Sequence, residues 1–432
     1  MFKKKIKKSI LFKTLYKSNQ LNKINNLNPI LELYNGKIYS NILKSFINIC
    51  IRLLGKKIFS IKKSYPRTLT NLLSSWLFSL YSYYDFSDNY FLPSNFHYTK
   101  QLEETLIDFC KYDETILNKE EKISKIIEKL HSVYQYGLNS IKLYENSDYY
   151  KNNSKNYKII KNKIVQKRKH SDKEIFFYKL DIKKKIYIRD NRLYNILDNI
   201  LLPVTVYNKL KNKYTGPENK MDEYIWIILY RYQLLGSNNH QLGVLPTILK
   251  QMKKDFGLNF ECFASAINNT LDSFCSVYYD VERYFGSKGS FFNLEPCEGT
   301  YGFNPPYQND VMERGINLIF NHLDKSSSMQ KKLSFVITIP IWDSDGQEIM
   351  DKKYNNKSIT KIDYGEFRII EDIKKSKYFG GLRMIPKEEF TYLDHNFHLY
   401  KNVTIQNTYI IVLTNDKEND FMSRINQYKF QI

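Results

Sequence analysis

Cysteine, glycine and proline are scarce in this chain of 432 residues, which contains five cysteines, 16 glycines and 11 prolines. The odd number of cysteines and the absence of a C-x-x-C pair argue against a disulfide framework or a zinc site, and they favour a reducing compartment. The low glycine and proline content excludes collagen-like and low-complexity chains. The phosphate-binding patterns G-x-G-x-x-G and G-x-x-x-x-G-K-[ST] are also absent.

Long apolar runs are lacking as well. The lysine-rich N-terminal residues hold only the short run Ile10-Leu11-Phe12, which is too short for a secretory signal. Residues 68–84 are the least charged stretch, but Asn71 and several serines within it favour a buried helix over a membrane span. We therefore expect no secretion and no membrane partner.

Positive charge is abundant, with a formal net charge of +21 and an isoelectric point near 9.3. Such an excess favours a polyanionic partner, nucleic acid first and an acidic membrane surface second. Hydrophobic residues make up 42% of the chain, which is enough for two or three domains with real cores.

Three regions follow one another along the chain. Residues 1–66 form a basic N-terminal arm or a pair of amphipathic helices, and both interpretations remain open. Residues 67–240 have mostly helical spacing and are expected to contribute to RNA binding, except for a polar loop or insertion at 146–170. The cation-rich segment 183–192 suits a phosphate backbone or a plain surface helix equally well. Residues 241–432 alternate strands with helices, which predicts a doubly wound α/β domain.

Polar side chains follow several of the strands predicted in the last region. Ser265, Asp280, Asn304 and Trp342 each come directly after an apolar run. Because ligands of such sheets bind at the carboxyl ends of the strands, we expect these four residues to share one rim. Asp280 is the candidate ligand for a ribose hydroxyl, with Glu282 as its competitor and a helix-capping role as the alternative.

The stretch Asn304-Pro305-Pro306-Tyr307 lies between a predicted strand and a predicted helix. The two prolines fix the backbone and offer no N–H groups. The Asn304 side-chain oxygen and the Pro305 carbonyl are therefore suited to accept from the two N–H bonds of an exocyclic amine such as adenine N6, while Tyr307 offers a stacking ring. Asn-Pro and Pro-Pro are also ordinary turn signals.

Five blocks in series together resemble one family: 261–268 (ECFASAIN), 275–290 (CSVYYDVERYFGSKGS), 303–307 (FNPPY), 334–342 (SFVITIPIW) and 407–413 (NTYIIVL). They resemble the phosphorylated-CTD-interacting factor family, the cap-specific adenosine N6-methyltransferases. The similarity extends over about residues 222–415. The family's Phe after the two prolines is Tyr307 here, and its Pro-Glu-Trp is Pro340-Ile341-Trp342, so the glutamate is missing.

The resemblance implies a class I (Rossmann-like) S-adenosylmethionine-dependent methyltransferase domain preceded by a helical domain. The implied reaction is methylation of N6 of the adenosine next to the 7-methylguanosine cap of mRNA, which forms N6,2′-O-dimethyladenosine, in the nucleus or the cytoplasm. The only tryptophans are Trp76, Trp226 and Trp342, without a paired pattern. We therefore expect that the chain lacks the family's WW domain and does not bind a phosphorylated polymerase tail through one.

The predicted site residues fall into three groups, and no metal is expected. Predicted catalytic residues are Asn304, Pro305, Pro306 and Tyr307. Predicted cofactor contacts are Glu261, Phe263, Ala264, Ser265, Asp280 and Asn304. Predicted substrate contacts are Tyr307, Asn309, Trp342, Asp343 and Lys288.

Two other functions remain open. One is an adenine N6-methyltransferase that acts on DNA or internal RNA, because Asn-Pro-Pro-Tyr serves those enzymes too. The other is a catalytically silent subunit that binds a cap or RNA, against which the intact tetrapeptide argues.

Overall fold

The structure is a computed structural model. It describes residues 27–55, 65–83, 91–93, 96, 100–110, 116–167, 173–182, 200–235, 241–306, 309–340, 368–395, 401–405 and 407–431. The basic segments 1–19 and 183–192 lie outside the described residues, as do Tyr307, Trp342 and Asp343.

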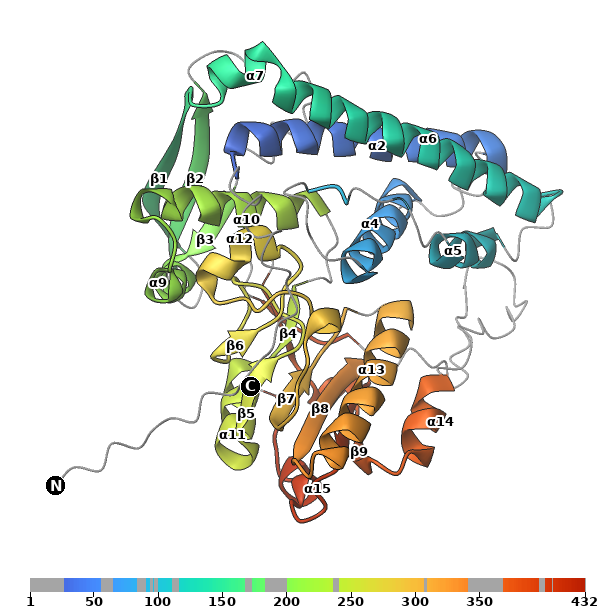
Figure 1. The fold of residues 1–432 in the computed structure, drawn as a ribbon, viewed down its shortest axis with the longest axis vertical. Helices are drawn as coiled ribbons and strands as arrows, with labels where there is room; N and C mark the ends of the chain where they lie inside the picture. The colour runs from blue at the N-terminus through green and yellow to red at the C-terminus, as the bar shows by residue number, and fades with distance from the viewer. Residues whose placement is uncertain are drawn as a thin grey trace.

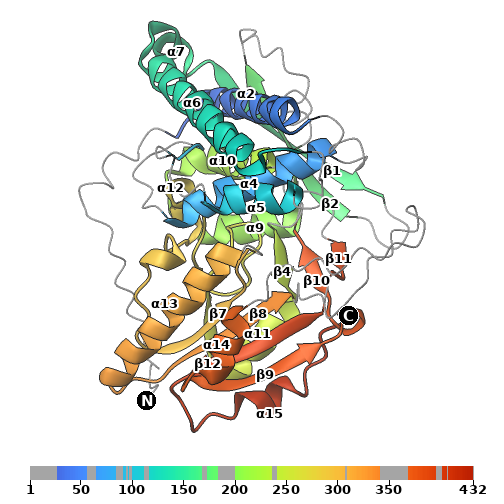
Figure 2. The same ribbon diagram turned by 90° about the vertical axis from the view of Figure 1, so that its right-hand side faces the viewer.

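The N-terminal region is predominantly helical. Its helices are α2 (Pro29–Leu54), α4 (Tyr65–Tyr83), α5 (Lys100–Cys110), α6 (Lys119–Asn146), α7 (Asp148–Asn153), α9 (Val204–Lys213) and α10 (Met221–Leu235). The long helices α2 and α6 lie side by side at one end of the molecule (Figures 1 and 2). Helix α2 begins where the Asn28 side chain accepts from the Ile30 N–H at 2.8 Å, and it ends at Gly55, whose φ of 93° favours glycine.

A small antiparallel sheet interrupts the helices. It consists of β1 (Tyr157–Gln166), β2 (Lys173–Ile182) and β3 (Ile200–Pro203), in that order. The prediction of a loop at 146–170 was therefore wrong. Apolar and polar residues alternate poorly along β1, so side-chain contacts outside the strand help to stabilise it. Lys161 Nζ, for example, lies 4.2 Å from the centre of the Tyr207 ring and 2.8 Å from Asp222 Oδ2.

The C-terminal region is built around a six-stranded sheet. Its strands are β5 (Leu258–Glu261), β6 (Ser273–Phe274), β7 (Gly299–Phe303), β8 (Leu333–Pro340), β9 (Phe379–Ile385) and β12 (Thr408–Thr414). The order is β6-β5-β7-β8-β12-β9. The pairs from β6 to β8 are parallel, and β12 is antiparallel to both of its neighbours. The fold is thus mixed α/β, with a helical N-terminal region and a mostly parallel sheet.

Helices cover both faces of this sheet (Figure 1). In β8 the side chains of Phe335 and Ile337 join the core under α13 (Asn309–Ser328) and α14 (Arg368–Lys375). Val336 joins the opposite core with α11 (Pro246–Phe256) and α15 (Phe421–Ile425). Every residue of β8 is buried, as expected for a central strand that is covered on both faces. A second small sheet, β11-β10-β4, comprises β4 (Leu242–Val244), β10 (Tyr392–Asp394) and β11 (Lys401–Val403).

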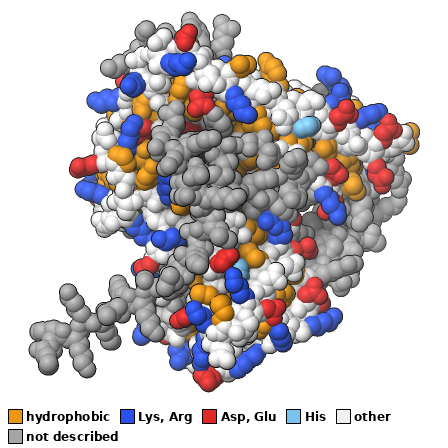
Figure 3. Space-filling view, viewed as in Figure 1, with side chains coloured by type: hydrophobic (Ala, Val, Ile, Leu, Met, Phe, Trp, Pro, Cys, Tyr) orange, Lys and Arg blue, Asp and Glu red, His pale blue; other side chains and the backbone are white. Residues whose placement is uncertain are grey.

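Short helical turns complete the described chain: α12 (Tyr279–Glu282), η1 (Glu218–Lys220), η2 (Arg283–Phe285), η3 (Phe291–Asn293) and η4 (Lys387–Glu389). None of the described helices is both long and apolar enough to cross a bilayer. Lysine and arginine side chains are scattered over the described part of the face in Figure 3 and do not gather in one patch.

Candidate active site

The Asn304-Pro305-Pro306 corner follows directly on β7. Phe303, the last residue of the strand, has its ring centre 5.2 Å from that of Phe263 and 5.3 Å from that of Phe291. Helix α13 packs on the other side of the same ring through Gly315, where an added Cβ would lie 2.4 Å from the Phe303 ring. The residue before the corner is therefore held on several sides, which fixes the position of Asn304.

A cavity opens beside this corner. Its empty space is about 680 Å³, counting the part open to solvent, which suits a small-molecule ligand. The walls come from segments that follow β5, β6 and β7, and from helices α4 and α10. The lining residues are Phe78, Tyr81, Tyr232, Gln241, Leu242, Cys262, Phe263, Ala264, Asn268, Cys275, Ser276, Val277, Ser290, Phe291, Phe292, Asn304, Pro305 and Pro306.

One polar atom in this wall lacks a partner. Asn304 Oδ1 is buried and has no hydrogen-bond partner among the described residues. Buried polar groups are nearly always hydrogen-bonded, so an unpaired acceptor at a cavity wall indicates a donor that the protein itself does not supply. A second, smaller space of about 370 Å³ shares Phe263 and Asn304 with the first, and Glu261 and Thr338 also line it. Asn304 therefore stands between two spaces.

The loop after β5 is fixed by its own side chains. The Ser265 N–H donates to Asn268 Oδ1 at 2.6 Å, and the Asn268 N–H donates back to Ser265 Oγ at 3.1 Å. Glu261 Oε1 accepts from the N–H groups of Thr270 and Leu271, both at 2.6 Å. Burial raises the pKa of Glu261, and these two N–H donors oppose the shift. The loop thus presents Ala264 and Asn268 to the cavity in one conformation.

Helix α9 holds the same loop from outside. Lys209 Nζ donates to the carbonyls of Ile267 at 2.7 Å and Asn269 at 2.9 Å, and Lys213 Nζ donates to that of Leu271 at 3.0 Å. Burial lowers the pKa of Lys209 to about 7. The helical region is therefore bonded directly to a cavity-forming loop.

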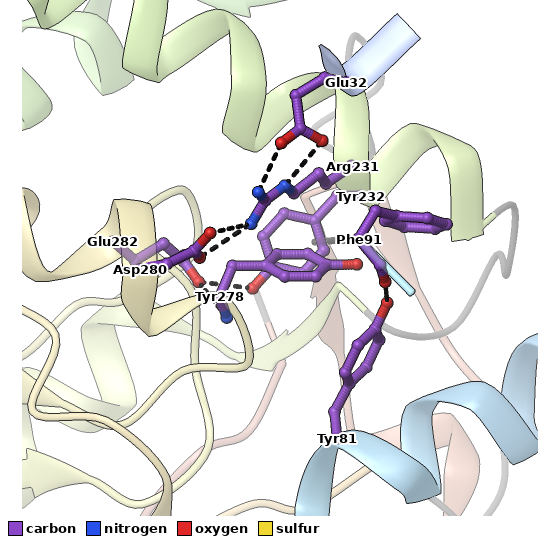
Figure 4. Close-up of polar contacts among 8 residues, drawn as sticks. All are labelled: Glu32, Tyr81, Phe91, Arg231, Tyr232, Tyr278, Asp280 and Glu282. Carbon is purple, nitrogen blue, oxygen red and sulfur yellow. Dashed lines mark hydrogen bonds and ion pairs between the residues drawn. The ribbon is translucent and has the colours of Figure 1, made fainter. Parts of the chain in front are cut away.

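Glu282 connects three elements around the cavity. Its Oε1 accepts from the Ala266 N–H at 2.7 Å. Its Oε2 accepts from the Tyr278 N–H at 3.1 Å and from the Tyr232 hydroxyl at 3.0 Å, and Figure 4 shows these two tyrosines beside Glu282. Burial raises the pKa of this carboxyl to about 7, although all three donors favour the ionised form. Glu282 therefore ties the loops after β5 and β6 to helix α10.

Asp280 is engaged elsewhere. Both of its oxygens accept from Arg231 Nη1, at 2.8 and 2.7 Å, while the rest of that guanidinium donates to Glu32 at 3.0 and 2.6 Å (Figure 4). Arg231 is only 1% exposed, so this arginine is a buried charge and not a surface charge. Asp280 does not line either of the two cavities described above, and its role as a ribose ligand stays a prediction.

The structure brings part of the predicted set together. Phe263, Ala264, Asn304, Pro305 and Pro306 line the larger cavity. Ser265 lies behind Ala264, where its Oγ donates to Gln241 Oε1 at 2.9 Å. Lys288 is exposed, and Asn309 is the first residue of α13.

Sequence reasoning missed most of the aromatic wall. Phe291 and Phe292 follow the Gly-Ser-Lys-Gly-Ser stretch, which was a usable local signal. Phe78, Tyr81 and Tyr232 come from helices whose apolar spacing indicates only burial. Cys262 and Cys275 also line the cavity, and burial raises the pKa of both thiols, which disfavours the nucleophilic thiolate.

Comparison with known proteins adds a family match and two relatives. The model of the family described as "Phosphorylated CTD interacting factor 1 WW domain" matches residues 204–372. A protein of Homo sapiens named mRNA (2'-O-methyladenosine-N(6)-)-methyltransferase is 29% identical over 201 residues, which are 44% of this chain and 26% of the human protein. A protein of Mus musculus with the same name is 27% identical over 174 residues, 38% of this chain and 23% of the mouse protein. The chain spans about a quarter of the length of these curated relatives.

The family match corrects two expectations. The chain was expected to lack the WW domain, and binding of a phosphorylated polymerase tail through such a domain was expected to be absent. Both expectations were wrong, because residues 204–372 match the model that carries this description. The chain has no paired-tryptophan pattern, yet the match extends over a long segment that contains Trp226 and Trp342.

Proposed function

We propose that this chain is an S-adenosylmethionine-dependent methyltransferase that modifies N6 of the adenosine next to the cap of mRNA, in the nucleus or the cytoplasm. The observation that carries the proposal is the buried, unpaired Asn304 Oδ1 at a cavity formed by loops after three parallel strands. Ligands of open α/β sheets bind at this edge. The names of the human and mouse relatives supply the substrate.

The sheet supports assignment to the class I, Rossmann-like methyltransferases. Its order β6-β5-β7-β8-β12-β9, with the single reversed strand β12 next to the edge, provides a parallel half whose carboxyl ends meet at the cavity. We assign residues 241–432 to the methyl-transfer domain. The helical region before it would contribute to RNA binding, which its basic composition favours.

The residues around the cavity fit an adenosine-containing methyl donor. The space is of small-molecule size, and its walls combine aromatic rings with a few polar groups such as Asn268 and Ser276. S-adenosylmethionine, when bound, supplies an electrophilic methyl group on a sulfonium. Phe263, Ala264 and Asn268 would hold it, with Glu261 and Ser265 fixing the loop that carries them.

Asn304 would orient the accepting amine. Its free Oδ1 and the Pro305 carbonyl would accept from the two N–H bonds of adenine N6, which favours a more nucleophilic nitrogen. The transfer needs no covalent enzyme intermediate, in keeping with the raised thiol pKa values of Cys262 and Cys275. On the substrate side we propose Tyr307, Asn309, Trp342, Asp343 and Lys288 as RNA contacts.

The first test replaces Asn304 with alanine. Asn304→Ala should lower the rate of methyl transfer to a capped RNA beginning with 2′-O-methyladenosine by about 100-fold or more, as expected for the loss of one preorganised hydrogen-bonding group. Binding of S-adenosylmethionine, measured by calorimetry, should change by less than about threefold. Asn317→Ala, on the exposed side of α13, is the matched control and should retain full activity.

The second comparison decides the substrate. Radiolabelled methyl transfer is measured on capped and uncapped RNAs that begin with each of the four nucleotides, and on a DNA duplex. Activity confined to the capped adenosine RNA supports the proposal. Equal activity on uncapped RNA or on DNA would replace it with a general adenine N6-methyltransferase, and an Asn304→Ala variant as active as the wild type would rule out the mechanism.

A further inference from the structure

The larger cavity has a wall that does not belong to the α/β region. Phe78 and Tyr81 come from α4, and Tyr232 comes from α10. We call these three residues the helical wall. The loops after β5 and β6 complete the same cavity with Ala264, Asn268, Ser276 and Val277. The cavity is therefore shared between the two regions of the chain.

The two tyrosines of the helical wall have their hydroxyl groups engaged by the protein. The Tyr232 hydroxyl donates to Glu282 at 3.0 Å, and the Tyr81 hydroxyl donates to the carbonyl of Phe91 (Figure 4). Both side chains are almost completely buried, at 6% and 2% exposure. A ligand in the cavity would accordingly meet their rings, while their hydroxyl protons are already committed.

Tyr278 fixes the positions of these rings. It lies between them, with ring centres 5.4 Å from Tyr81 and 4.9 Å from Tyr232, both in edge-to-face geometry (Figure 4). The guanidinium carbon of Arg231 lies 5.3 Å from the centre of the Tyr278 ring, and Arg231 is itself held by Asp280 and Glu32. Edge-to-face aromatic contacts and paired buried charges leave the wall little freedom to move.

We propose that the helical wall is part of the methyl-donor site, and that the Tyr232 ring packs against the adenosine-containing donor. This inference rests on the proposed function and goes beyond it, because it assigns donor binding to the helical region as well. An aromatic ring offers a flat apolar face to a purine, and stacked aromatics account for about 5- to 150-fold in affinity for a base. The α/β region alone would thus form an incomplete donor site.

The test separates the ring from the hydroxyl of Tyr232 in the full-length chain. Affinities for S-adenosylmethionine and S-adenosylhomocysteine are measured by calorimetry for the wild type, Tyr232→Leu and Tyr232→Phe. Tyr232→Leu should weaken both by about tenfold, while Tyr232→Phe, which keeps the ring, should stay within about threefold. The control is Tyr224→Leu, in the same helix but outside the cavity lining, and its affinity per folded molecule should equal that of the wild type.

Each outcome has one meaning. If Tyr232→Leu binds the donor as tightly as the wild type, or if Tyr224→Leu weakens binding equally, the inference is overturned while the proposed function stands. If the wild type binds neither compound, the proposed function fails first. Should Tyr232→Leu not fold, Phe78→Leu provides the same comparison from α4, with an expected loss of about threefold to tenfold and an unchanged affinity as the overturning result.

Discussion

At the scale of single residues, Glu282 shows how a buried carboxyl is kept in place by donors from several elements. Its pKa is raised to about 7 by burial, against an ordinary value of 4.5. Its accepted hydrogen bonds come from Ala266, Tyr278 and Tyr232. The folded state therefore retains a proton on Glu282 over a pH range in which the unfolded chain has already released it.

This difference predicts a pH-dependent stability. Between about pH 4.5 and 7 the folded state binds more protons at Glu282, so stability should fall as pH rises through this window and level off above it. Glu282→Gln should remove this contribution, which is on the order of 3 kcal/mol for a shift of this size. The free energy of unfolding of both proteins is measured at pH 5 and pH 8. Between these two pH values it should fall more for the wild type than for the variant.

Two buried histidines also make the stability depend on pH. The quantity to compare is therefore the difference in pH dependence between the wild type and Glu282→Gln. Burial lowers the pKa of His322 to about 4 and that of His395 to about 3. Both are neutral in the folded state where the unfolded chain binds a proton, so their contribution to stability rises with pH up to about 6.5, opposite to that of Glu282. Identical pH slopes in wild type and Glu282→Gln would contradict the assignment to Glu282.

At the residue scale, the local sequence pattern predicted that the Asn304 corner lies between a strand and a helix, as it does in the structure, while the catalytic role of Asn304 stays a prediction. Asn304 and the two prolines are contiguous, and the sequence around them shows the strand and helix that position them. The partner of Asp280 was not predictable in this way, because Arg231 lies 49 residues from Asp280 in the sequence and 199 residues from Glu32, the second carboxyl that it binds. Only the packing of α2, α10 and α12 brings these three charges together.

At the scale of elements, α13 and β7 are joined at Gly315. Alanine usually stabilises a helix interior by about 1 kcal/mol relative to glycine. Here an added Cβ would lie 2.4 Å from the Phe303 ring, so Gly315→Ala should instead destabilise the protein by about 1–3 kcal/mol. Because Phe303 directly precedes Asn304, methyl transfer should fall as well. Denaturant unfolding and the capped-RNA assay measure the two effects.

Asn317→Ala is the comparison for this variant. It lies on the exposed side of the same helix and should be neutral or slightly stabilising. If Gly315→Ala proved as stable and as active as Asn317→Ala, the contact between α13 and Phe303 would not position the Asn304 corner.

Elements with a clear pattern were predicted well. The alternation of strands and helices expected for residues 241–432 is present in the structure, and strand β8, apolar apart from Ser334 and Thr338, is buried throughout. Strand β1 was missed because half of its residues are charged or amides, and its stability comes from pairing with β2 along ten register positions. Such pairing is a tertiary effect that the local pattern does not carry.

At the scale of the whole molecule, the buried triad Glu32–Arg231–Asp280 joins the helical region to the α/β region (Figure 4). Arg231→Met would leave two buried carboxylates without a cation, and should destabilise the protein by about 3–5 kcal/mol. Adding Glu32→Gln and Asp280→Asn to the same protein should recover most of this loss, since the uncompensated charges disappear. Thermal and denaturant unfolding of both variants check the prediction.

A single variant as stable as the wild type would show that the triad does not hold the two regions together. A triple variant less stable than the single one would point instead to the geometry of the hydrogen bonds, as neutral side chains cannot reproduce the bidentate contacts of a guanidinium.

The arrangement of the two regions was the least predictable feature. Composition and periodicity predicted a helical region followed by an α/β region, and the structure has both in that order. Nothing local in α4 or α10 indicates that Phe78 and Tyr232 reach a cavity formed by the other region. A cavity shared by two regions depends on how those regions pack. The apolar periodicity within one helix does not indicate that packing.

The position of β12 has a consequence for biosynthesis. A ribosome releases β9 before β12, yet β12 is the strand that joins β9 to the rest of the sheet. A nascent chain stopped ahead of Thr408 would hold β8 as an unpaired, largely apolar edge strand, of the kind that attracts chaperones or aggregates. Truncated translation products of this protein should therefore be cleared, and only chains that include this last strand should mature.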